Sequence, residues 1–325
     1  MLTSVRLQGF KSFNDATVKL APLTVLIGAN GSGKSNFLDG LQLTARFIYG
    51  MSLNAALNGD RTLPAIRAGL EITNFHYVLN FKGIGSVDID SQRESDVFKF
   101  NGDHVNLRGA LDDFAQFQVL QLEPNVLRRY EGNSGVRLML GHNGEGFSKL
   151  ASQIWNNETD RVAYLDWIQE LRPEQIADFA VREGAAGDLL FGVTEKNGRW
   201  IPAPALSDGT LRFAALVAVL FQPIKPILLC IEEIENGMHP ARLRLVLELL
   251  RAFVANGTQV IVTTHAPWLL AWLSQEELAA TQIFYRGEDG SSQVKSCGEH
   301  GFLMDALKNT PIEELFAEGY LEQTL

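Results

Sequence analysis

The sequence predicts an α/β fold in which a mixed, mostly parallel sheet is flanked by helices. Three observations lead to this prediction. Strand-like apolar runs alternate with helix-like runs toward both ends of the 325-residue chain. The runs at 22–27, 226–231 and 259–263 are almost entirely apolar, as strands covered on both faces are. Shorter alternating runs precede the first of them, which predicts that antiparallel strands open the chain.

The first elements follow in a fixed order. Period-two alternation at 4–10 and 16–20 predicts two half-buried strands, and 22–27 predicts a central strand. A glycine-rich turn, GANGSGKS, occupies 28–35. Apolar residues then recur at helical spacing over 36–48. The chain therefore opens with strands, a glycine-rich loop and a helix.

The middle of the chain has a weaker pattern, which we interpret as an inserted α+β lobe. Strands are predicted at 69–82, 96–100 and 116–122, and helices near 148–156 and 160–171. No heptad pattern persists there, so no long coiled coil is expected.

Regular α/β order resumes after the lobe. A very apolar helix is predicted at 207–221, a strand at 226–231, an amphipathic helix around 243–254 and a strand at 259–263. Short segments separated by turns follow.

Composition excludes several classes of protein. Forty-six per cent apolar and 20% charged residues describe a globular chain, not a disordered or collagen-like one. Two cysteines, with no CxxC or HExxH motif, provide neither a disulfide framework nor a zinc ligand set. No apolar run approaches the ~20 residues that span a bilayer, and the start has no signal peptide, so we expect a cytoplasmic protein without membrane contact. The net charge of −10 disfavours a surface that is basic all over.

The glycine-rich turn has the pattern of a phosphate-binding loop, Gly28-x-x-x-x-Gly33-Lys34-Ser35. Its glycines let backbone N–H groups converge on phosphate oxygens, Lys34 adds a positive charge and Ser35 offers a hydroxyl to Mg²⁺. Its place between a strand and a helix is the one that this chemistry requires. The candidate nucleotide-binding residues here are Gly28, Ala29, Asn30, Gly31, Ser32, Gly33, Lys34, Ser35 and Asn36.

Two acidic residues follow the apolar strand at 226–231. Open α/β sheets place their ligands at the carboxyl ends of strands, where Glu232 and Glu233 lie. Glu232 is predicted to hold Mg²⁺ through water, and Glu233 to polarise the attacking water. His265 directly follows the last apolar strand, and the LSDGT segment at 206–210 opens a helix whose free N–H groups favour anions.

These motifs together resemble the RecF/SMC-like branch of ABC ATPases, and more narrowly the stand-alone bacterial "AAA family ATPases" related to the OLD and RecF groups. The resemblance rests on LTSVRLQGFKSF, GANGSGKSN, LSDGTLRFAALVAVL, LLCIEEIENGMHP and VIVTTHAPWLL. It implies a P-loop NTPase head of the ABC type at 1–50 and 202–325, with the inserted lobe at 51–201.

The resemblance also implies ATP and Mg²⁺ as cofactors, and a homodimer that sandwiches ATP between two heads. Ser207 and Gly209 of one subunit would cap the γ-phosphate bound to the other, and His265 would contact that phosphate within its own subunit. By the same resemblance Lys11 lies near the nucleotide, and Gln118 or Gln121 is the magnesium-sensing glutamine, with Gln121 our choice.

The chain departs from the family pattern at several points. Glu232 stands where aspartate is common, and Ile234 replaces a usual proline, which predicts a looser turn and slow hydrolysis. We expect no coiled coil, zinc hook or hinge, and therefore no cohesin-like ring. The segment after His265 is too short for the Toprim nuclease of OLD proteins.

The work that ATP hydrolysis drives is left open between two hypotheses. The first is a DNA transaction in repair or anti-phage defence, because of the RecF/SMC likeness and a patch formed by Arg128, Arg129, Tyr130 and Arg137. The second is a protein-binding switch that holds or releases a separate effector, such as a nuclease or toxin, because the chain is acidic and lacks a second catalytic module. A transporter subunit fits the RecF-like start less well.

Overall fold

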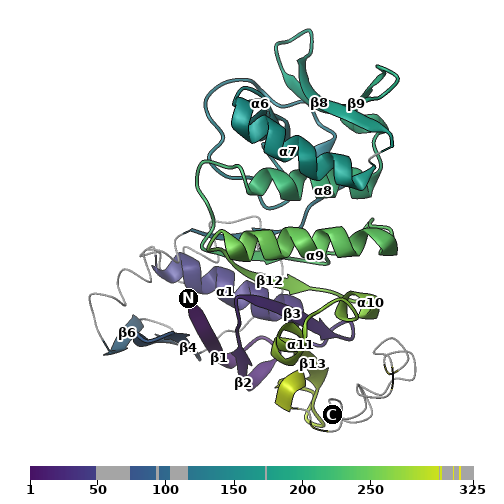
Figure 1. Ribbon diagram of the computed structural model, residues 1–325. Helices are drawn as coiled ribbons and strands as arrows, with labels where there is room; N and C mark the ends of the chain where they lie inside the picture. The colour runs from purple at the N-terminus through teal and green to yellow at the C-terminus, as the bar shows by residue number, and fades with distance from the viewer. Residues whose placement is uncertain are drawn as a thin grey trace. The chain divides into compact units, whose positions relative to one another are not determined.

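The structure is a computed structural model that describes residues 1–48, 74–92, 95–102, 116–172 and 174–299, with residues 301, 310 and 315 (Figure 1). The chain divides into two compact units. The first unit comprises Met1–Phe117, Ile227–Cys230 and Gln259–Leu325, and the second comprises Gln118–Pro226 and Ile231–Thr258. These units cut across the predicted head and inserted lobe, and that division stays a prediction.

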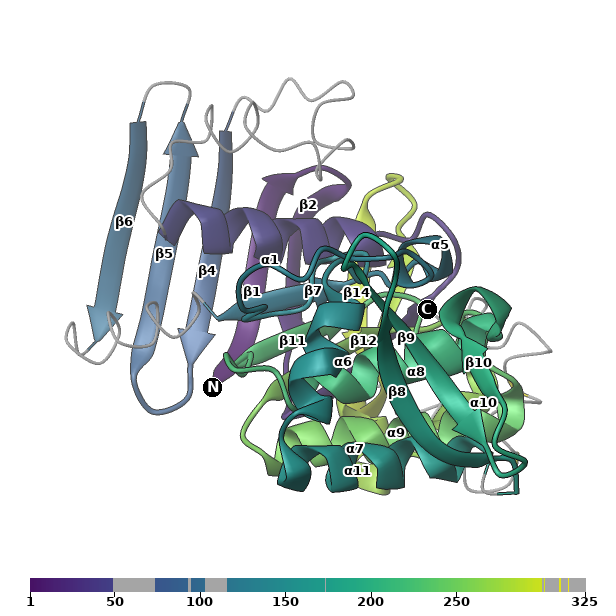
Figure 2. The same ribbon diagram turned by 90° about the horizontal axis from the view of Figure 1, so that it is seen from above.

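An antiparallel sheet opens the first unit, as predicted. Its strand order is β2-β1-β4-β5-β6, and its strands are β1 (Leu2–Phe10), β2 (Phe13–Lys19), β4 (Asn74–Phe81), β5 (Gly85–Gln92) and β6 (Ser95–Gly102) (Figure 2). Val5 of β1 pairs with Val18 and Leu79, and all three are buried, so the apolar side of the alternation forms a core face. Strand β5 was not predicted from the sequence, and residues 69–73 of the predicted strand at 69–82 lie outside the described residues.

A second sheet carries the central strands, in the order β14-β13-β3-β12-β11-β7. Its strands are β3 (Leu23–Gly28), β7 (Phe117–Leu120), β11 (Leu228–Ile231), β12 (Gln259–Thr263), β13 (Gln282–Arg286) and β14 (Ser292–Ser296). Both β12 and β13 pair with β3 in parallel, whereas β13 and β14 are antiparallel. The predicted mixed, mostly parallel sheet is confirmed.

Helix α1 (Lys34–Ile48) packs between strands of both sheets of the first unit. The ring of Phe37 lies 6.0 Å from that of Phe284 on β13. A Cβ on Gly40 would lie 3.3 Å from Leu7 and from Tyr77, which belong to the antiparallel sheet. Short helices among the described residues of this unit are α10 (Pro267–Leu270) and α11 (Gln275–Ala280).

The second unit is built mainly from helices. They are α5 (Pro124–Leu127), α6 (Phe147–Trp155), α7 (Glu158–Leu171), α8 (Asp208–Val219) and α9 (Pro240–Ala255). Helix α8 is the most apolar and is almost entirely buried, with the Tyr164 hydroxyl of α7 donating to Ala214 O at 3.0 Å. The predictions near 148–156, 160–171, 207–221 and 243–254 are therefore confirmed.

A small antiparallel sheet completes the second unit and was not predicted. Its order is β10-β9-β8, with β8 (Ile176–Glu183), β9 (Leu189–Glu195) and β10 (Trp200–Pro202) (Figure 2). Across the described part of both units, no helix combines the length and apolar character needed to cross a membrane.

Candidate functional site

The loop between β3 and α1 needs glycine at two positions. Gly28 has φ +147° and Gly33 has φ +116°, which are conformations that other residues rarely adopt. A Cβ on Gly28 would lie 2.2 Å from Phe284 O, and a Cβ on Gly33 would lie 2.3 Å from Ser292 Oγ. Strands β13 and β14 therefore press against the loop, and only glycine fits in both places.

Lys34 lies at the centre of this loop. Its Nζ donates to Gly28 O at 2.6 Å and to Ala29 O at 3.1 Å, and the residue is only 5% exposed. Ser32 Oγ is buried in the same loop and has no hydrogen-bond partner within the part of the chain that the structure describes. An enclosed ammonium group and an unpaired hydroxyl beside a glycine backbone fit the oxygens of a bound phosphate chain.

Side chains distant in sequence support the loop. Ser292 Oγ of β14 lies 2.6 Å from Ser32 O and 2.7 Å from Ser12 Oγ, and Asn36 Nδ2 donates to the same Ser12 oxygen at 2.7 Å. Arg286 Nε of β13 donates to Gly31 O at 2.8 Å. Ser12, Arg286 and Ser292 were not predicted from the sequence, although the Asp-Gly turn between β13 and β14 is a hairpin signal.

His265 lies at the same sheet edge as the loop. Because β12 and β3 are parallel neighbours, their carboxyl ends meet there, and Thr264 N donates to Leu26 O at 3.1 Å. His265 follows directly and is exposed. Its predicted contact with a γ-phosphate stays a prediction.

Lys11 is held by a helix rather than by the loop. It has φ +49°, and its side chain, 7% exposed, forms an ion pair with Asp39 of α1. Its predicted proximity to the nucleotide stays a prediction.

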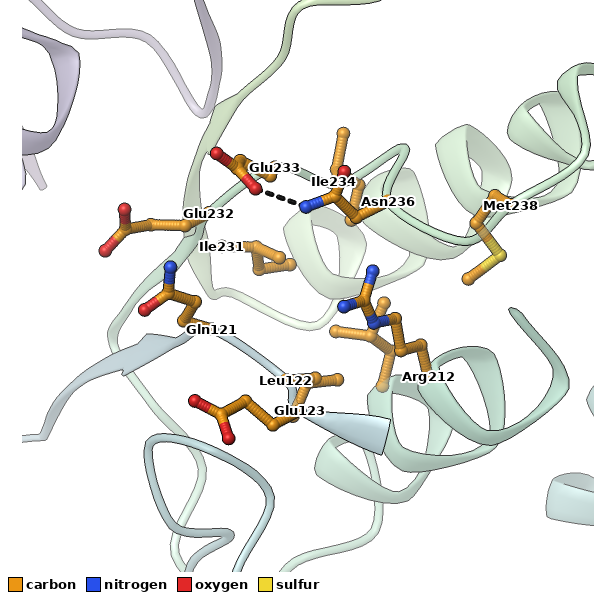
Figure 3. Close-up of a pocket in the computed structure, with 11 residues that line it drawn as sticks. Gln121, Leu122, Glu123, Arg212, Ile231, Glu232, Glu233, Ile234, Asn236 and Met238 are labelled. Atoms are coloured by element: carbon orange, nitrogen blue, oxygen red, sulfur yellow. Dashed lines mark hydrogen bonds between the residues drawn. The ribbon is translucent and has the colours of Figure 1, made fainter. Parts of the chain in front are cut away.

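In the second unit, a pocket of about 120 Å³ gathers the acidic residues (Figure 3). Gln121 follows β7, Glu232 and Glu233 follow β11, and all three line it. Glu232 N donates to Leu120 O at 2.9 Å, which fixes the backbone at the start of the acidic pair. Gln118 does not line this pocket, because its side chain is buried and donates to Leu140 O at 2.8 Å.

The turn after Glu233 is closed even though Ile234 replaces the usual proline. Asn236 N donates to Glu233 O at 2.9 Å, and Asn236 Nδ2 donates to the Glu233 carboxylate. Ile234 is 3% exposed and anchors the turn by burial. Packing and hydrogen bonds therefore act at this turn in place of the proline ring, and the looser turn and slow hydrolysis expected from sequence stay predictions. Glu233 itself has φ +48°, a conformation that costs ~1–3 kcal/mol and is concentrated at functional sites.

The LSDGT segment forms the N-terminus of α8. Ser207 is its exposed N-cap, and its Oγ accepts from Thr210 N at 3.3 Å. A Cβ on Gly209 would lie 2.5 Å from Gly237 O, so glycine is required by this close approach. Arg128 forms an ion pair with Asp208 of the same turn, so one cation of the predicted basic patch is engaged here.

Two charged residues of the pocket were not found from sequence. Glu123 lines it, and Arg212 extends into it from α8 (Figure 3). Arg212 was detectable as the only charged side chain between Gly209 and Val219 in a helix that is otherwise apolar. Burial lowers the pKa of Arg212, and the carboxylates of Asp208, Glu233 and Glu123 oppose that shift.

The acidic residues do not form a complete metal site by themselves. Among the described residues, no group of three or more His, Cys, Asp or Glu side chains is arranged to hold a metal ion. The assignment of Ser35 and Glu232 as ligands of Mg²⁺ stays a prediction.

A comparison with protein families decides the classification. A family model described as "AAA domain, putative AbiEii toxin, Type IV TA system" matches residues 87–271, more than half of the chain. The chain belongs to this AAA-domain family. A second model, "AAA ATPase domain", matches residues 1–59.

Curated relatives of this AAA-domain chain are chromosome partition proteins named Smc. The chain is 31% identical over 139 residues to the one from Xanthomonas oryzae pv. oryzae, an overlap covering 42% of this chain and 10% of that protein. It is 39% identical over 70 residues to the one from Halothermothrix orenii, covering 21% of this chain and 6% of that protein. The matches span a tenth or less of these relatives.

Solved structures show the same fold. An Smc head bound to the C-terminal winged-helix domain of ScpA superposes with a TM-score of 0.60 at 17% identity, covering 94% of this chain and 99% of that one. The SMC head domain from Thermotoga maritima gives 0.53 at 17% identity, covering 91% and 98%. These superpositions confirm the predicted fold of the head, and the AAA-domain models and the Smc relatives confirm the resemblance to the RecF/SMC-like ABC ATPases.

Proposed function

We propose that this protein is a Mg²⁺-dependent ATP hydrolase. The observation that carries the proposal is the loop at 28–35, where Gly28 and Gly33 leave no room for a Cβ and Lys34 donates to the carbonyl oxygens of Gly28 and Ala29. Membership of an AAA-domain family supports nucleotide hydrolysis in general.

Each site residue has a role in the proposed reaction. Lys34 exchanges the carbonyls of Gly28 and Ala29 for phosphate oxygens and stabilises the charge of the leaving phosphate. Bound Mg²⁺, held by Ser35 and Glu232, would neutralise charge on the phosphate oxygens. Glu233 orients the attacking water and accepts hydrogen bonds from it. His265 senses the γ-phosphate, and Gln121 monitors the metal.

The proposed active form is a homodimer. Ser207 is exposed at the N-terminus of a twelve-residue helix, where free N–H groups favour an anion, so it is available to a phosphate bound by a second copy. Gly209 keeps that turn close to Gly237. If the second subunit completes the active site, specific activity rises with protein concentration until all of the protein is dimeric.

A DNA transaction is the first candidate for the work done, because the curated relatives are chromosome partition proteins. The structure favours the second candidate, an effector-holding switch, in one respect. Arg128 is paired with Asp208 inside the second unit, so fewer cations of the predicted patch are available for phosphate contacts.

The test is the steady-state rate of ATP hydrolysis with and without duplex DNA at ~0.15 M salt, since phosphate contacts weaken steeply with salt. Lys34→Ala serves as the blank. A wild-type rate above that of Lys34→Ala supports the proposed activity, and a wild-type rate equal to that of Lys34→Ala rejects it. Stimulation by DNA favours the DNA role, whereas a rate unaffected by DNA favours the effector switch.

A further inference from the structure

Arg212 lies where two functional segments of the second unit meet. It belongs to α8, the helix that begins at Ser207, and its guanidinium points into the pocket lined by Glu233 and Asn236 (Figure 3). A Cβ built on Gly237 would lie 3.6 Å from Arg212 Nη1. The guanidinium therefore packs against the segment that follows Glu233.

The charges around Arg212 are negative on several sides. Glu123 approaches from the segment after β7, Glu233 from the segment after β11 and Asp208 from the first turn of α8, while Glu232 also lines the pocket. A planar guanidinium with five donors can contact more than one carboxylate at once, which an ammonium group cannot do in the same geometry.

The burial of Arg212 is incompletely compensated. Its Nε is buried and lacks a hydrogen-bond partner within the described part of the chain. An apolar side chain would suit α8 better, since the residues from Leu211 to Val219 are otherwise buried and apolar. Packing of α8 does not explain a cation at position 212. We infer that the charge of Arg212 serves the pocket.

We propose that Arg212 is a positioning residue, whose guanidinium holds the Glu233 carboxylate and the segment from Glu233 to Met238 in the arrangement that hydrolysis requires. Arg212 does not touch the nucleotide. It joins the helix that carries Ser207 to the residue that orients water, so displacement of that helix is passed to Glu233. This inference rests on the proposed ATPase function.

The experiment compares Arg212→Met, Arg212→Lys and Arg244→Met in the full chain. Methionine keeps the apolar stem, lysine keeps the charge, and Arg244 is an exposed cation of α9 outside the pocket. We expect Arg212→Met to lower kcat about 10- to 100-fold, because misplacing a catalytic group by ~1 Å can cost ~100-fold, while the Kd for ATP stays within about twofold. Arg212→Lys recovers part of kcat, and Arg244→Met matches the wild type. Unchanged kcat in Arg212→Met, or equal losses in kcat and affinity, would overturn the proposal.

A second measurement separates failure of this inference from failure of the proposed function. If the wild type hydrolyses no ATP, the urea midpoints of Arg212→Met, Glu233→Gln and the double variant still test the electrostatic interaction between the two side chains. We expect the double variant to shift less than the two single shifts combined, since both remove the same interaction. Additive shifts would contradict an interaction between the two side chains.

Discussion

Gly33→Ala tests whether packing by β14 shapes the phosphate-binding loop. The new methyl group meets Ser292 Oγ at 2.3 Å and Ser292 Cβ at 2.8 Å, and the backbone has φ +116°. Backbone strain of this kind costs about 1–3 kcal/mol, and overpacking costs about 1–3 kcal/mol more. We therefore expect a loss of about 2–6 kcal/mol, a large part of the ~5–15 kcal/mol typical of folded proteins.

Gly31→Ala is the matched control for that variant. Gly31 also has positive φ, at +76°, but a Cβ there would meet nothing within 4 Å. Its substitution should cost only the backbone part, about 1–2 kcal/mol. Urea unfolding at constant m-value measures both losses, and titration with ATP measures the accompanying loss of binding.

Ser292→Gly provides the rescue, because it removes both clashing atoms. We expect the change in urea midpoint caused by Ser292→Gly to be more favourable in the Gly33→Ala background than in the wild-type background. If Gly33→Ala is no less stable than Gly31→Ala, or if Ser292→Gly gives no such gain, steric contact with β14 does not shape the loop.

Three further predictions concern other buried groups. Asp39→Asn leaves the buried Lys11 ammonium without its ion-pair partner and should lower stability by ~3 kcal/mol, measured by urea unfolding; a loss below ~1 kcal/mol would contradict burial of that pair. Burial raises the pKa of Glu131, so its contribution to stability is present below pH 4.5 and is lost as the pH rises through the raised pKa. The free energy of unfolding of Glu131→Gln should therefore increase relative to that of the wild type as the pH rises through this range. Parallel curves of unfolding free energy against pH for the two proteins would contradict the prediction. Cys230 and Cys297 are both fully buried, and burial raises the pKa of the Cys297 thiol to about 12, so iodoacetamide should modify neither until urea unfolds the chain, as mass spectrometry would show.

The parts of the site that are local in sequence could be predicted from the sequence. The loop at 28–35 joins one strand to one helix, and its chemistry is encoded by neighbouring residues. Glu232 and Glu233 were found in the same way, because they directly follow a buried strand. The spacing and number of apolar residues also located the helices between 148 and 255, because each of these helices buries one face or nearly its whole surface.

The parts that depend on contacts between distant segments could not be predicted. Ser292 reaches the loop only because β13 pairs with β3 and places the next strand beside it. The contact between Gly209 and Gly237 likewise depends on how α8 meets the turn after β11. Strand β5 alternates apolar and acidic residues, and β9 contains the apolar run Leu189–Val193, so both were missed although their patterns were visible.

The most direct test of the central claim measures ATP binding at equilibrium and hydrolysis in a single turnover for the wild type, Lys34→Ala and Glu233→Gln. We expect Lys34→Ala to lose both, because the loop loses its buried cation. Glu233→Gln should bind ATP with a Kd close to that of the wild type and hydrolyse it at least ~100-fold more slowly, as loss of a general base predicts. A Glu233→Gln protein that hydrolyses ATP at the wild-type rate would contradict the account.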